Sequence, residues 1–412
     1  MKYGLIGEKL GHSFSKPLHE QLAGYTYEIT EIAREDIDNF FASADFEAIN
    51  VTIPYKEIAL SYMNEAEPLA KEVGAVNTVV NRGGKLYGYN TDVYGMTELF
   101  RHAKIDPEGK KVAILGTGGT SKTARVCLGI LGAGEVIKVS RTSKADAVTY
   151  EELYEKHGDV DIIVNTTPVG TYPSVDCAPV DISRFSKLSG VIDAVYNPLR
   201  TELVSEALSM GIRAEGGLYM LAAQAVRASE IFIDTKYPNG TVDKIYRTLL
   251  RQKENIVLVG MPSSGKSTVS KYISERLGRE LVDTDGIITE NEGTDIPTIF
   301  RERGEQAFRD AEAKAVSATA KEPSRVIATG GGAILRPENV RALKRCGRIY
   351  FIDRPLEQLI PTSSRPLASD RAALEQRYRE RYPIYTSVCD VRIDGSGSIE
   401  DVAERIIKEF CK

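Results

Sequence analysis

The chain has 412 residues, of which 42% are hydrophobic and 27% charged, and its net charge is −5. At ~100–200 residues per domain this length predicts two or three globular domains. The charge balance excludes a strongly basic nucleic-acid binder, and the five scattered cysteines form no CxxC pair typical of zinc sites. Because no apolar run reaches the length of a membrane span, we expect a cytoplasmic enzyme with small-molecule substrates and no nucleic-acid or membrane partner. Composition leaves the oligomeric state open.

The first hundred residues alternate short apolar runs with polar segments. Tyr3–Gly7 and Ile49–Ile53 predict strands, the second ending at a proline. Pro17 suits the first turn of a helix that is preceded by hydroxyl residues. Ser13 and Ser15 at this helix start could bind a small carboxylate, although N-capping alone would explain them equally well.

Four polar residues stand near the ends of the other apolar runs in this region. Lys56 follows the second strand and could lie at the mouth of a cleft, but a single lysine is more often a solvated surface charge. Asn77, Asn90 and Asp92 lie in apolar or glycine-rich surroundings, where burial would require hydrogen-bond partners. We expect Gly88–Asp92 to be a turn after a strand, and ordinary loop chemistry is the alternative for each of these residues.

A dinucleotide-binding pattern begins at residue 111. Lys111–Leu115 predicts a buried strand, followed by a glycine-rich turn and a helix. The phosphate-facing positions of this turn are Gly116, Gly118, Gly119 and Thr120. The next strand, Val136–Val139, leads to Arg141 and Lys144 where an NAD site usually has an acidic residue. Since arginine binds a 2′-phosphate bidentately, we predict NADP(H) rather than NAD, with an ordinary surface arginine as the alternative.

The rest of the first 250 residues continues as an α/β pattern. Ile162–Pro168 and Val191–Pro198 predict strands that end in polar residues, as expected at the ligand-binding carboxyl edge of a parallel sheet. Residues 242–252 predict an amphipathic helix that runs almost directly into the next domain.

These segments together resemble the shikimate dehydrogenase family over residues 1 to about 250. The similar blocks are HSFSKP, NVTIPYK, GAVNT, NTD, NTTP and DAVYNP, in that order, with Lys16 as an addition to the family's serine–proline spacing. The resemblance implies that Lys56 and Asp92 form the catalytic pair. It further implies substrate contacts from Ser13, Ser15, Thr52, Asn77, Tyr196 and Gln224, and a cofactor contact from Thr166. A lysine suits this chemistry because hydride transfer to a ketone leaves charge on the oxygen, which a proton-donating cation stabilises.

A second nucleotide site begins at Gly260–Ser267, which fits the P-loop pattern G-x-x-x-x-G-K-[ST]. Ile256–Val259 predicts the strand before it, and Gly278 is placed to cap the helix after it. We expect ATP phosphates to bind Gly260, Ser263, Ser264, Gly265, Ser267 and Thr268. Lys266 would reach the outer phosphates, and the hydroxyl of Ser267 would bind Mg²⁺.

Residues 253–412 as a whole resemble the shikimate kinase family. The similar blocks are GMPSSGKS, DTD, GE..FR..E, GGG, RPL and R.P.Y. The resemblance implies that Asp285 accepts the proton of the attacking hydroxyl and that Asp283 faces Mg²⁺. It also implies substrate contacts from Arg309, Gly331, Gly332 and Arg381, and an ATP contact from Arg365 in a short lid. Two arginines make a directional carboxylate clamp, although solvation is the alternative for Arg381 on its highly charged helix.

The sequence therefore predicts an α/β fold with three parts. A substrate domain spans 1–100 and is completed by 215–250, a Rossmann NADP domain spans 101–235, and a P-loop kinase domain with a parallel sheet spans 253–412. The predicted function is a fused shikimate dehydrogenase and shikimate kinase using NADP(H), ATP and Mg²⁺. Two alternatives are kept. Only one half is catalytic, as the departure at Thr289 and the short lid would allow, or the first half is a quinate-type dehydrogenase using NAD.

Overall fold

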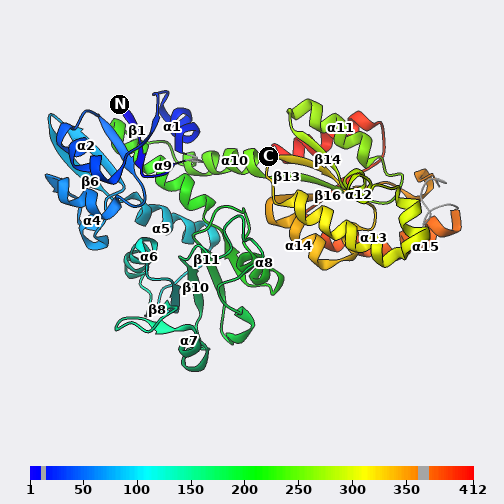
Figure 1. Cartoon of the computed structure of the whole chain (residues 1–412), viewed down its shortest axis with the longest axis horizontal. Coiled ribbons are helices and arrows are strands. Elements are labelled where there is room, and N and C mark those ends of the chain that lie inside the picture. The colour runs from blue at the N-terminus through cyan, green and yellow to red at the C-terminus, as the bar shows by residue number, and fades with distance from the viewer. Residues whose placement is uncertain (11–14, 361–370) are drawn as a thin grey trace. The chain divides into compact units, whose positions relative to one another are not determined.

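The computed structural model of the chain describes residues 1–10, 15–360 and 371–412. These residues form two compact units, Met1–Leu249 and Leu250–Lys412, drawn in Figure 1. The division falls inside helix α10 (Thr241–Lys253), slightly before the predicted start of the kinase domain at 253. No helix among the described residues is long and apolar enough to cross a membrane.

The first sheet of unit 1 is mixed, with strand order β2-β1-β3-β5-β6-β4. Strand β5 runs antiparallel to both of its neighbours, and the remaining pairs are parallel. The strands are β1 (Tyr3–Gly7), β2 (Glu28–Glu31), β3 (Ala48–Val51), β4 (Glu65–Ala66), β5 (Thr78–Arg82) and β6 (Lys85–Tyr89). The helices are α1 (Ser15–Ala23), η1 (Arg34–Asp36), α2 (Ile37–Ser43), α3 (Lys56–Ala59), η2 (Leu60–Tyr62) and α4 (Pro68–Val73). We call residues 1–90 the first lobe.

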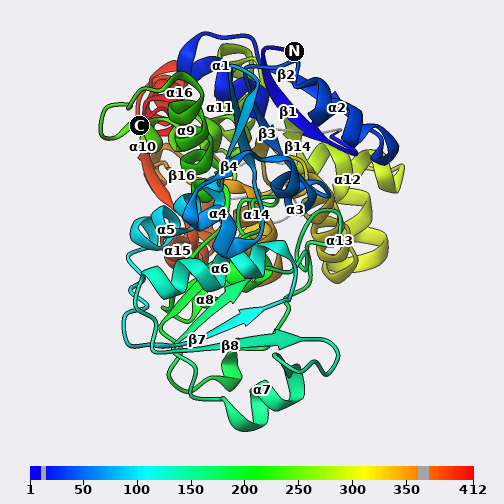
Figure 2. The same cartoon turned by 90° about the vertical axis from the view of Figure 1, so that its left-hand side faces the viewer.

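The second sheet of unit 1 is parallel throughout, with strand order β12-β11-β10-β7-β8-β9. Its strands are β7 (Lys111–Leu115), β8 (Glu135–Ser140), β9 (Val148–Thr149), β10 (Ile162–Asn165), β11 (Gly190–Asp193) and β12 (Arg213–Glu215). Its helices are α6 (Gly119–Ile130), α7 (Tyr150–Lys156), η3 (Ile182–Arg184) and α8 (Glu202–Ser209). Val112 and Ile114 pack in one apolar cluster with α6, whereas Ala113 and Leu115 pack in another with α7 and α8. Helices therefore cover both faces, as Figure 2 shows for α6 and α7. We call residues 104–217 the second lobe.

Two long helices join the lobes of unit 1. They are α5 (Thr91–Ala103) and α9 (Leu218–Ile233), and they pack directly against each other. A Cβ atom on Gly95 would lie 2.8 Å from the carbonyl oxygen of Met220, so only glycine permits this close approach. Helix α9 also contacts α1, β3 and β5, so this helix packs onto the first lobe.

Unit 2 is built on a parallel sheet with strand order β14-β15-β13-β16-β17. The strands are β13 (Asn255–Val259), β14 (Glu280–Asp283), β15 (Arg325–Ala328), β16 (Gly347–Asp353) and β17 (Val391–Asp394). The helices are α11 (Lys266–Leu277), α12 (Thr284–Glu292), α13 (Ile296–Ala320), η4 (Ala333–Leu335), α14 (Pro337–Cys346), η5 (Leu356–Gln358), α15 (Arg371–Val388) and α16 (Ile399–Phe410). Strand β13 is buried at every position, and Gly278 ends α11 with φ 64°, so the predicted strand, loop and helix are confirmed.

Two local predictions were wrong. Strand β3 ends at Val51 rather than Ile53, because the N–H of Tyr55 donates to the carbonyl of Thr52 (2.9 Å) and closes a turn. The segment ending at Asp92 is not a turn, since Asn90 caps α5 and places Asp92 in its first turn. Asp285 lies in the first turn of α12, just after β14.

Candidate active sites

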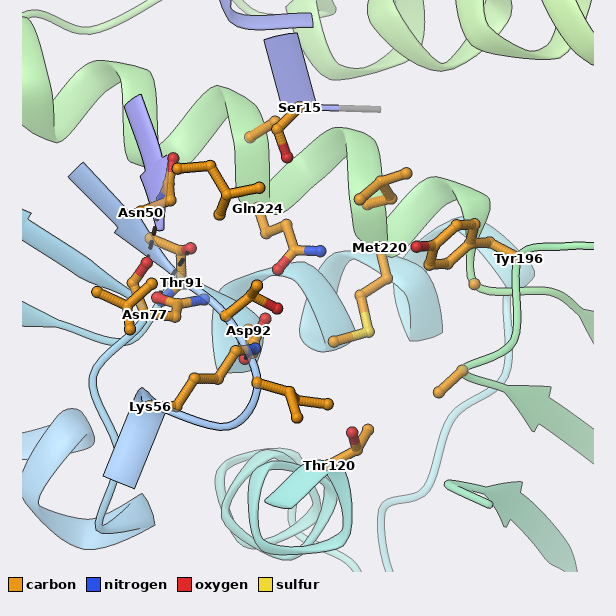
Figure 3. A pocket seen from close by; sticks show the side chains of 18 of the residues that line it. Ser15, Asn50, Lys56, Asn77, Thr91, Asp92, Thr120, Tyr196, Met220 and Gln224 are labelled. Atoms are coloured by element: carbon orange, nitrogen blue, oxygen red, sulfur yellow. Dashed lines mark hydrogen bonds and ion pairs between the residues drawn. The ribbon is translucent and has the colours of Figure 1, made fainter. Parts of the chain in front are cut away.

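A pocket of unit 1 collects most of the residues predicted to bind substrate. Its volume of about 420 Å³ suits a small ligand, and both lobes and α9 line it. Eight predicted site residues line it: Ser15, Thr52, Lys56, Asn77, Asp92, Thr120, Tyr196 and Gln224. Figure 3 shows Lys56 and Asp92 side by side, with Tyr196 at the far side of Met220. The predicted residue Ser13 lies outside the described part of the chain.

The pocket contains one short ion pair. Lys56 is the first residue of α3, and its Nζ lies 2.7 Å from Oδ2 of Asp92 in the first turn of α5. The Asp92 carboxylate is favoured at this helix N-terminus. The two side chains are only 28% and 11% exposed, so water screens the pair weakly. A partly buried ammonium held by a carboxylate beside a ligand cavity can donate a proton to a reacting oxygen.

Three further pocket residues were missed by the sequence analysis. Asn50 and Thr91 form a hydrogen-bonded network with Asn77, in which the N–H of Thr91 donates to Asn77 Oδ1 (2.8 Å) and Asn50 Nδ2 donates to the Asn77 carbonyl (3.2 Å). His19 is 2% exposed, and its burial lowers its pKa to about 3, so the imidazole is neutral. The sequence blocks that resemble the family could have pointed to these residues. Asn50 lies in NVTIPYK, Thr91 lies in NTD, and His19 lies shortly after HSFSKP.

The glycine turn of the second lobe is open to a ligand. Gly116 has φ +106°, and a Cβ atom at Gly118 or Gly119 would meet nothing within 4 Å. Thr166 lies beneath this turn and donates to the carbonyl of Leu115 (2.6 Å). The N-terminus of α6 can therefore receive a pyrophosphate from the open side, while Thr166 supports the turn from below.

The two predicted phosphate-binding cations lie on the same side of the second lobe. Arg141 directly follows β8 and is exposed, and Lys144 Nζ donates to Thr117 Oγ1 (2.7 Å) in the glycine turn. The second lobe can thus offer an arginine and a lysine to an additional phosphate near its glycine turn.

The P-loop of unit 2 holds its lysine in a buried position. Lys266 is 5% exposed, and its Nζ donates to the carbonyls of Gly260 and Met261, both at 2.9 Å. Gly265 has φ +89° at the start of α11. Ser267 Oγ donates to Asp283 Oδ2 (3.3 Å), which brings together the two oxygen atoms predicted to bind Mg²⁺. Among the described residues no group of three His, Cys, Asp or Glu side chains could hold a metal ion.

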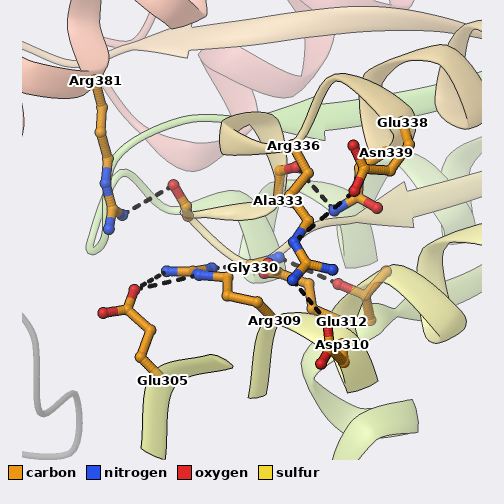
Figure 4. A network of polar contacts seen from close by, with 12 residues as sticks. Glu305, Arg309, Asp310, Glu312, Gly330, Ala333, Arg336, Glu338, Asn339 and Arg381 are labelled. Atoms are coloured by element: carbon orange, nitrogen blue, oxygen red, sulfur yellow. Dashed lines mark hydrogen bonds and ion pairs between the residues drawn. The ribbon is translucent and has the colours of Figure 1, made fainter. Parts of the chain in front are cut away.

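A buried polar network lies beside the P-loop in unit 2 (Figure 4). Arg309 Nη1 is 2.7 Å from Glu312 Oε2, and Arg309 Nη2 is 3.1 Å from Glu305 Oε1. Arg381 is 5% exposed and donates to the Gly331 carbonyl (3.0 Å), so the solvated alternative for Arg381 is wrong. Glu312 was part of the quoted pattern but was missed as a site residue. It is fully buried, and burial raises its pKa against the pull of Arg309.

The triple glycine Gly330–Gly332 lies in close contact with side chains of this network. A Cβ atom on Gly332 would lie 2.2 Å from Arg309 Nη1, and one on Gly330 would lie 2.7 Å from Asp285 Oδ1. Asp285 and Arg309 therefore flank the same backbone segment, and side chains there would displace both. Arg365 and the rest of 361–370 lie outside the described residues, so the predicted lid stays a prediction.

Comparison with known proteins finds a related family for each unit. A model of the shikimate dehydrogenase substrate binding domain matches residues 5–79. A shikimate dehydrogenase (NADP(+)) of Clostridium beijerinckii is 34% identical over 261 residues, covering 59% of this chain and 96% of the relative. The chain belongs to the shikimate dehydrogenase family. Shikimate dehydrogenase 1 of Peptoclostridium difficile has a crystal structure with a TM-score of 0.55 at 39% identity, covering 60% of this chain and 98% of that one.

One similar solved structure is a quinate dehydrogenase rather than a shikimate dehydrogenase. The quinate dehydrogenase of Corynebacterium glutamicum in complex with NAD has a TM-score of 0.54 at 26% identity, covering 61% of this chain and 98% of that one. Unit 2 matches a different family, because a shikimate kinase model covers residues 262–411. The chain thus combines a region of the shikimate dehydrogenase family with a domain that matches the shikimate kinase model.

Proposed function

We propose that unit 1 reduces 3-dehydroshikimate to shikimate with NADPH and that unit 2 phosphorylates shikimate to shikimate 3-phosphate with MgATP. The reduction rests on the 2.7 Å pair of Lys56 and Asp92 in a pocket reached by both lobes. The phosphorylation rests on the P-loop lysine at the start of α11 and the buried Arg309–Glu312 pair on α13. The product of the first reaction is the substrate of the second, so the chain carries two consecutive steps.

In the reduction, a bound NADPH would supply the hydride that the ketone carbon accepts. Lys56 stabilises the developing oxyanion and gives its Nζ proton to that oxygen, which completes the alcohol. Lys56 then regains a proton from solvent, and NADP⁺ leaves. Asp92 holds the lysine in place and accepts a hydrogen bond from a neighbouring ring hydroxyl. Ser15, Thr52, Asn77 and Gln224 orient the ring from the pocket wall.

In the phosphorylation, MgATP supplies the γ-phosphoryl group. Asp285 accepts the proton of the attacking hydroxyl, whose oxygen bonds to phosphorus while the bond to the ADP oxygen breaks. Lys266 would neutralise charge on the outer phosphates, Ser267 and Asp283 would hold Mg²⁺, and Arg309 and Arg381 would hold the substrate carboxylate. In this chemistry the protein mainly positions groups and neutralises charge.

Arg141 is proposed to set the cofactor preference. Replacing it with alanine should raise the KM for NADPH roughly 10- to 100-fold, because charge-assisted hydrogen bonds contribute about 1.5–3 kcal/mol each. The KM for NADH should change less than about twofold, because NADH lacks the 2′-phosphate that Arg141 would bind. Arg125→Ala, an exposed arginine on α6, is the matched control. An equal rise in both KM values would contradict the assignment and favour the quinate-type alternative.

The whole proposal is tested by one two-step assay on the purified chain. 3-Dehydroshikimate and NADPH are mixed and the nicotinamide absorbance is followed, and MgATP is then added with detection of shikimate 3-phosphate. Oxidation of NADPH followed by phosphate transfer supports both halves. Reduction without transfer would mean that only unit 1 is catalytic, the alternative raised by Thr289. Thr289 is exposed and its hydroxyl donates back to the Asp285 carbonyl (3.0 Å).

We also propose a cytoplasmic location, where both cofactors are available.

A further inference from the structure

We infer that Asp193, a buried aspartate outside the pocket, is a positioning residue that holds the second-lobe wall of the reduction site. The inference rests on the proposed reduction, and it concerns how the wall formed by Ala194, Tyr196 and Gly217 faces the Lys56–Asp92 pair. Asp193 is the last residue of β11 and is 0% exposed. It lines no part of the pocket, so it acts through other residues.

The carboxylate of Asp193 accepts three hydrogen bonds, one from the end of β10 and two from the loop 194–201. Asn165 Nδ2 at the end of β10 donates to Oδ1 (2.9 Å), and the N–H of Val195 donates to the same oxygen (3.0 Å). Thr201 Oγ1 donates to Oδ2 (2.6 Å). Thr201 also caps α8 by accepting from the N–H of Val204 (3.3 Å). One buried side chain therefore fixes both ends of the loop 194–201, which carries Tyr196.

The same contacts continue to the cofactor turn. The side-chain oxygen of Asn165 accepts from the N–H and hydroxyl of Thr167, at 3.0 and 2.7 Å. A Cβ atom on Gly116 would lie 3.1 Å from Thr167 Cγ2, so the glycine turn rests against this residue. Asp193 thus links the turn that receives the pyrophosphate with the loop that faces the substrate pocket.

The opposite side of the wall is fixed to the same loop. The N–H of Gly217 donates to the Val195 carbonyl (2.8 Å), and the N–H of Ala194 donates to the Asn165 carbonyl (2.9 Å). A Cβ atom on Gly217 would lie only 2.2 Å from the Ala194 carbonyl oxygen. With such close packing, a shift of Val195 would move Ala194 and Gly217 together. A displacement of about 1 Å in an active site can lower the rate of the chemical step roughly 10²-fold.

The charge on Asp193 is a cost to the fold, which supports a role other than stability. Burial raises its pKa to about 6, although the hydrogen bonds from Thr201, Val195 and Asn165 oppose the rise. An acid whose pKa is raised on folding contributes most to stability below its unfolded value and loses that contribution as pH rises through about 6. At pH 7.5 the ionised form is therefore unfavourable to the fold, and an amide at this position avoids that cost.

The test compares Asp193→Asn and Asp193→Ala in the full chain. The asparagine keeps an oxygen for Asn165 and Val195 but loses the acceptor for Thr201, so we expect kcat for 3-dehydroshikimate reduction to fall by roughly three- to tenfold. The Asp193→Ala variant loses all three contacts, so its kcat for this reduction should fall roughly 10²-fold. The KM for NADPH should stay within about threefold. With NADPH deuterated at the transferred position, the isotope effect on kcat should rise in both variants, because hydride transfer becomes slower.

Two controls separate positioning from folding. Kinase activity on the same chain should be unchanged, and the melting temperature of Asp193→Asn at pH 7.5 should not fall below wild type. Asp181→Asn is the matched variant, since Asp181 in the same lobe accepts from the N–H and hydroxyl of Ser183 but is exposed. It should leave kcat unchanged. If Asp193→Ala fails to fold, Asp193→Asn alone decides.

Two results would overturn the inference. One is a kcat and isotope effect for Asp193→Asn equal to those of wild type, and the other is a loss of activity that merely follows the unfolded fraction. If the wild-type chain itself did not oxidise NADPH with 3-dehydroshikimate, the proposed function would fail instead, and the two failures are therefore distinct.

Discussion

Lys56→Ala should lower kcat for NADPH-dependent reduction by roughly 10³-fold, about 4 kcal/mol of transition-state stabilisation. Two losses combine in this variant. The ketone oxygen loses the cation that stabilises its developing charge, and it loses the nearest proton donor. The remaining carboxylate of Asp92, 2.7 Å from the lysine in the wild type, would then face that oxygen with an unfavourable charge.

The measurement for this prediction uses both activities of the chain. NADPH binding, followed by nicotinamide fluorescence, should stay within about threefold, since Lys56 contacts the substrate side of the pocket. Kinase activity should be unchanged because its residues lie in unit 2. Lys71→Ala is the matched control, because Lys71 is an exposed lysine on α4 of the same lobe. A Lys56 variant that still reduced ketone at more than a tenth of the wild-type rate would remove Lys56 from the catalytic role.

Much of the fold could be predicted because its signals are local. The glycine turn at Gly116 and the P-loop at Gly260 each combine strand, loop and helix within about 20 residues, a span over which spacing determines geometry. The end of β3 and the first turn of α5 were mispredicted for a related reason. These two boundaries are set by hydrogen bonds of Tyr55 and Asn90 to residues close in the chain. The sequence around each boundary fits a strand or a turn equally well, so it does not reveal these bonds.

The site residues that sequence analysis missed depend on contacts between distant segments. Asp193 becomes important only because β10 lies beside β11, which brings Asn165 across from it in the parallel register. His19 shows no periodic signal for a pocket, since it reaches the cavity only once α1 is folded against α9. Glu312 differs from these two, because it shares a helix face with Arg309, and their i,i+3 spacing was visible in the sequence.

The separation of the two activities is most sharply tested in unit 2. Lys266→Ala should lower kcat for shikimate phosphorylation by roughly 10³-fold, at the upper end of the loss seen when one charge-stabilising donor is removed. Lys266 is buried, and in the described structure its Nζ already donates to two P-loop carbonyls. The ammonium therefore lies within the loop that cradles the phosphates, where no mobile surface cation could replace it.

The controls for Lys266→Ala mirror those for Lys56→Ala. Reduction of 3-dehydroshikimate should be unaffected, and Lys271→Ala should leave both activities intact, because Lys271 is an exposed lysine on the same helix α11. Loss of the two hydrogen bonds from Lys266 Nζ to the loop carbonyls is not expected to unfold unit 2, since β13 and the apolar clusters on both of its faces remain. Each lysine variant should thus silence one reaction and spare the other. If either variant abolished both reactions while the chain stayed folded, the two sites could not be independent, and the assignment of one reaction to each unit would have to be abandoned.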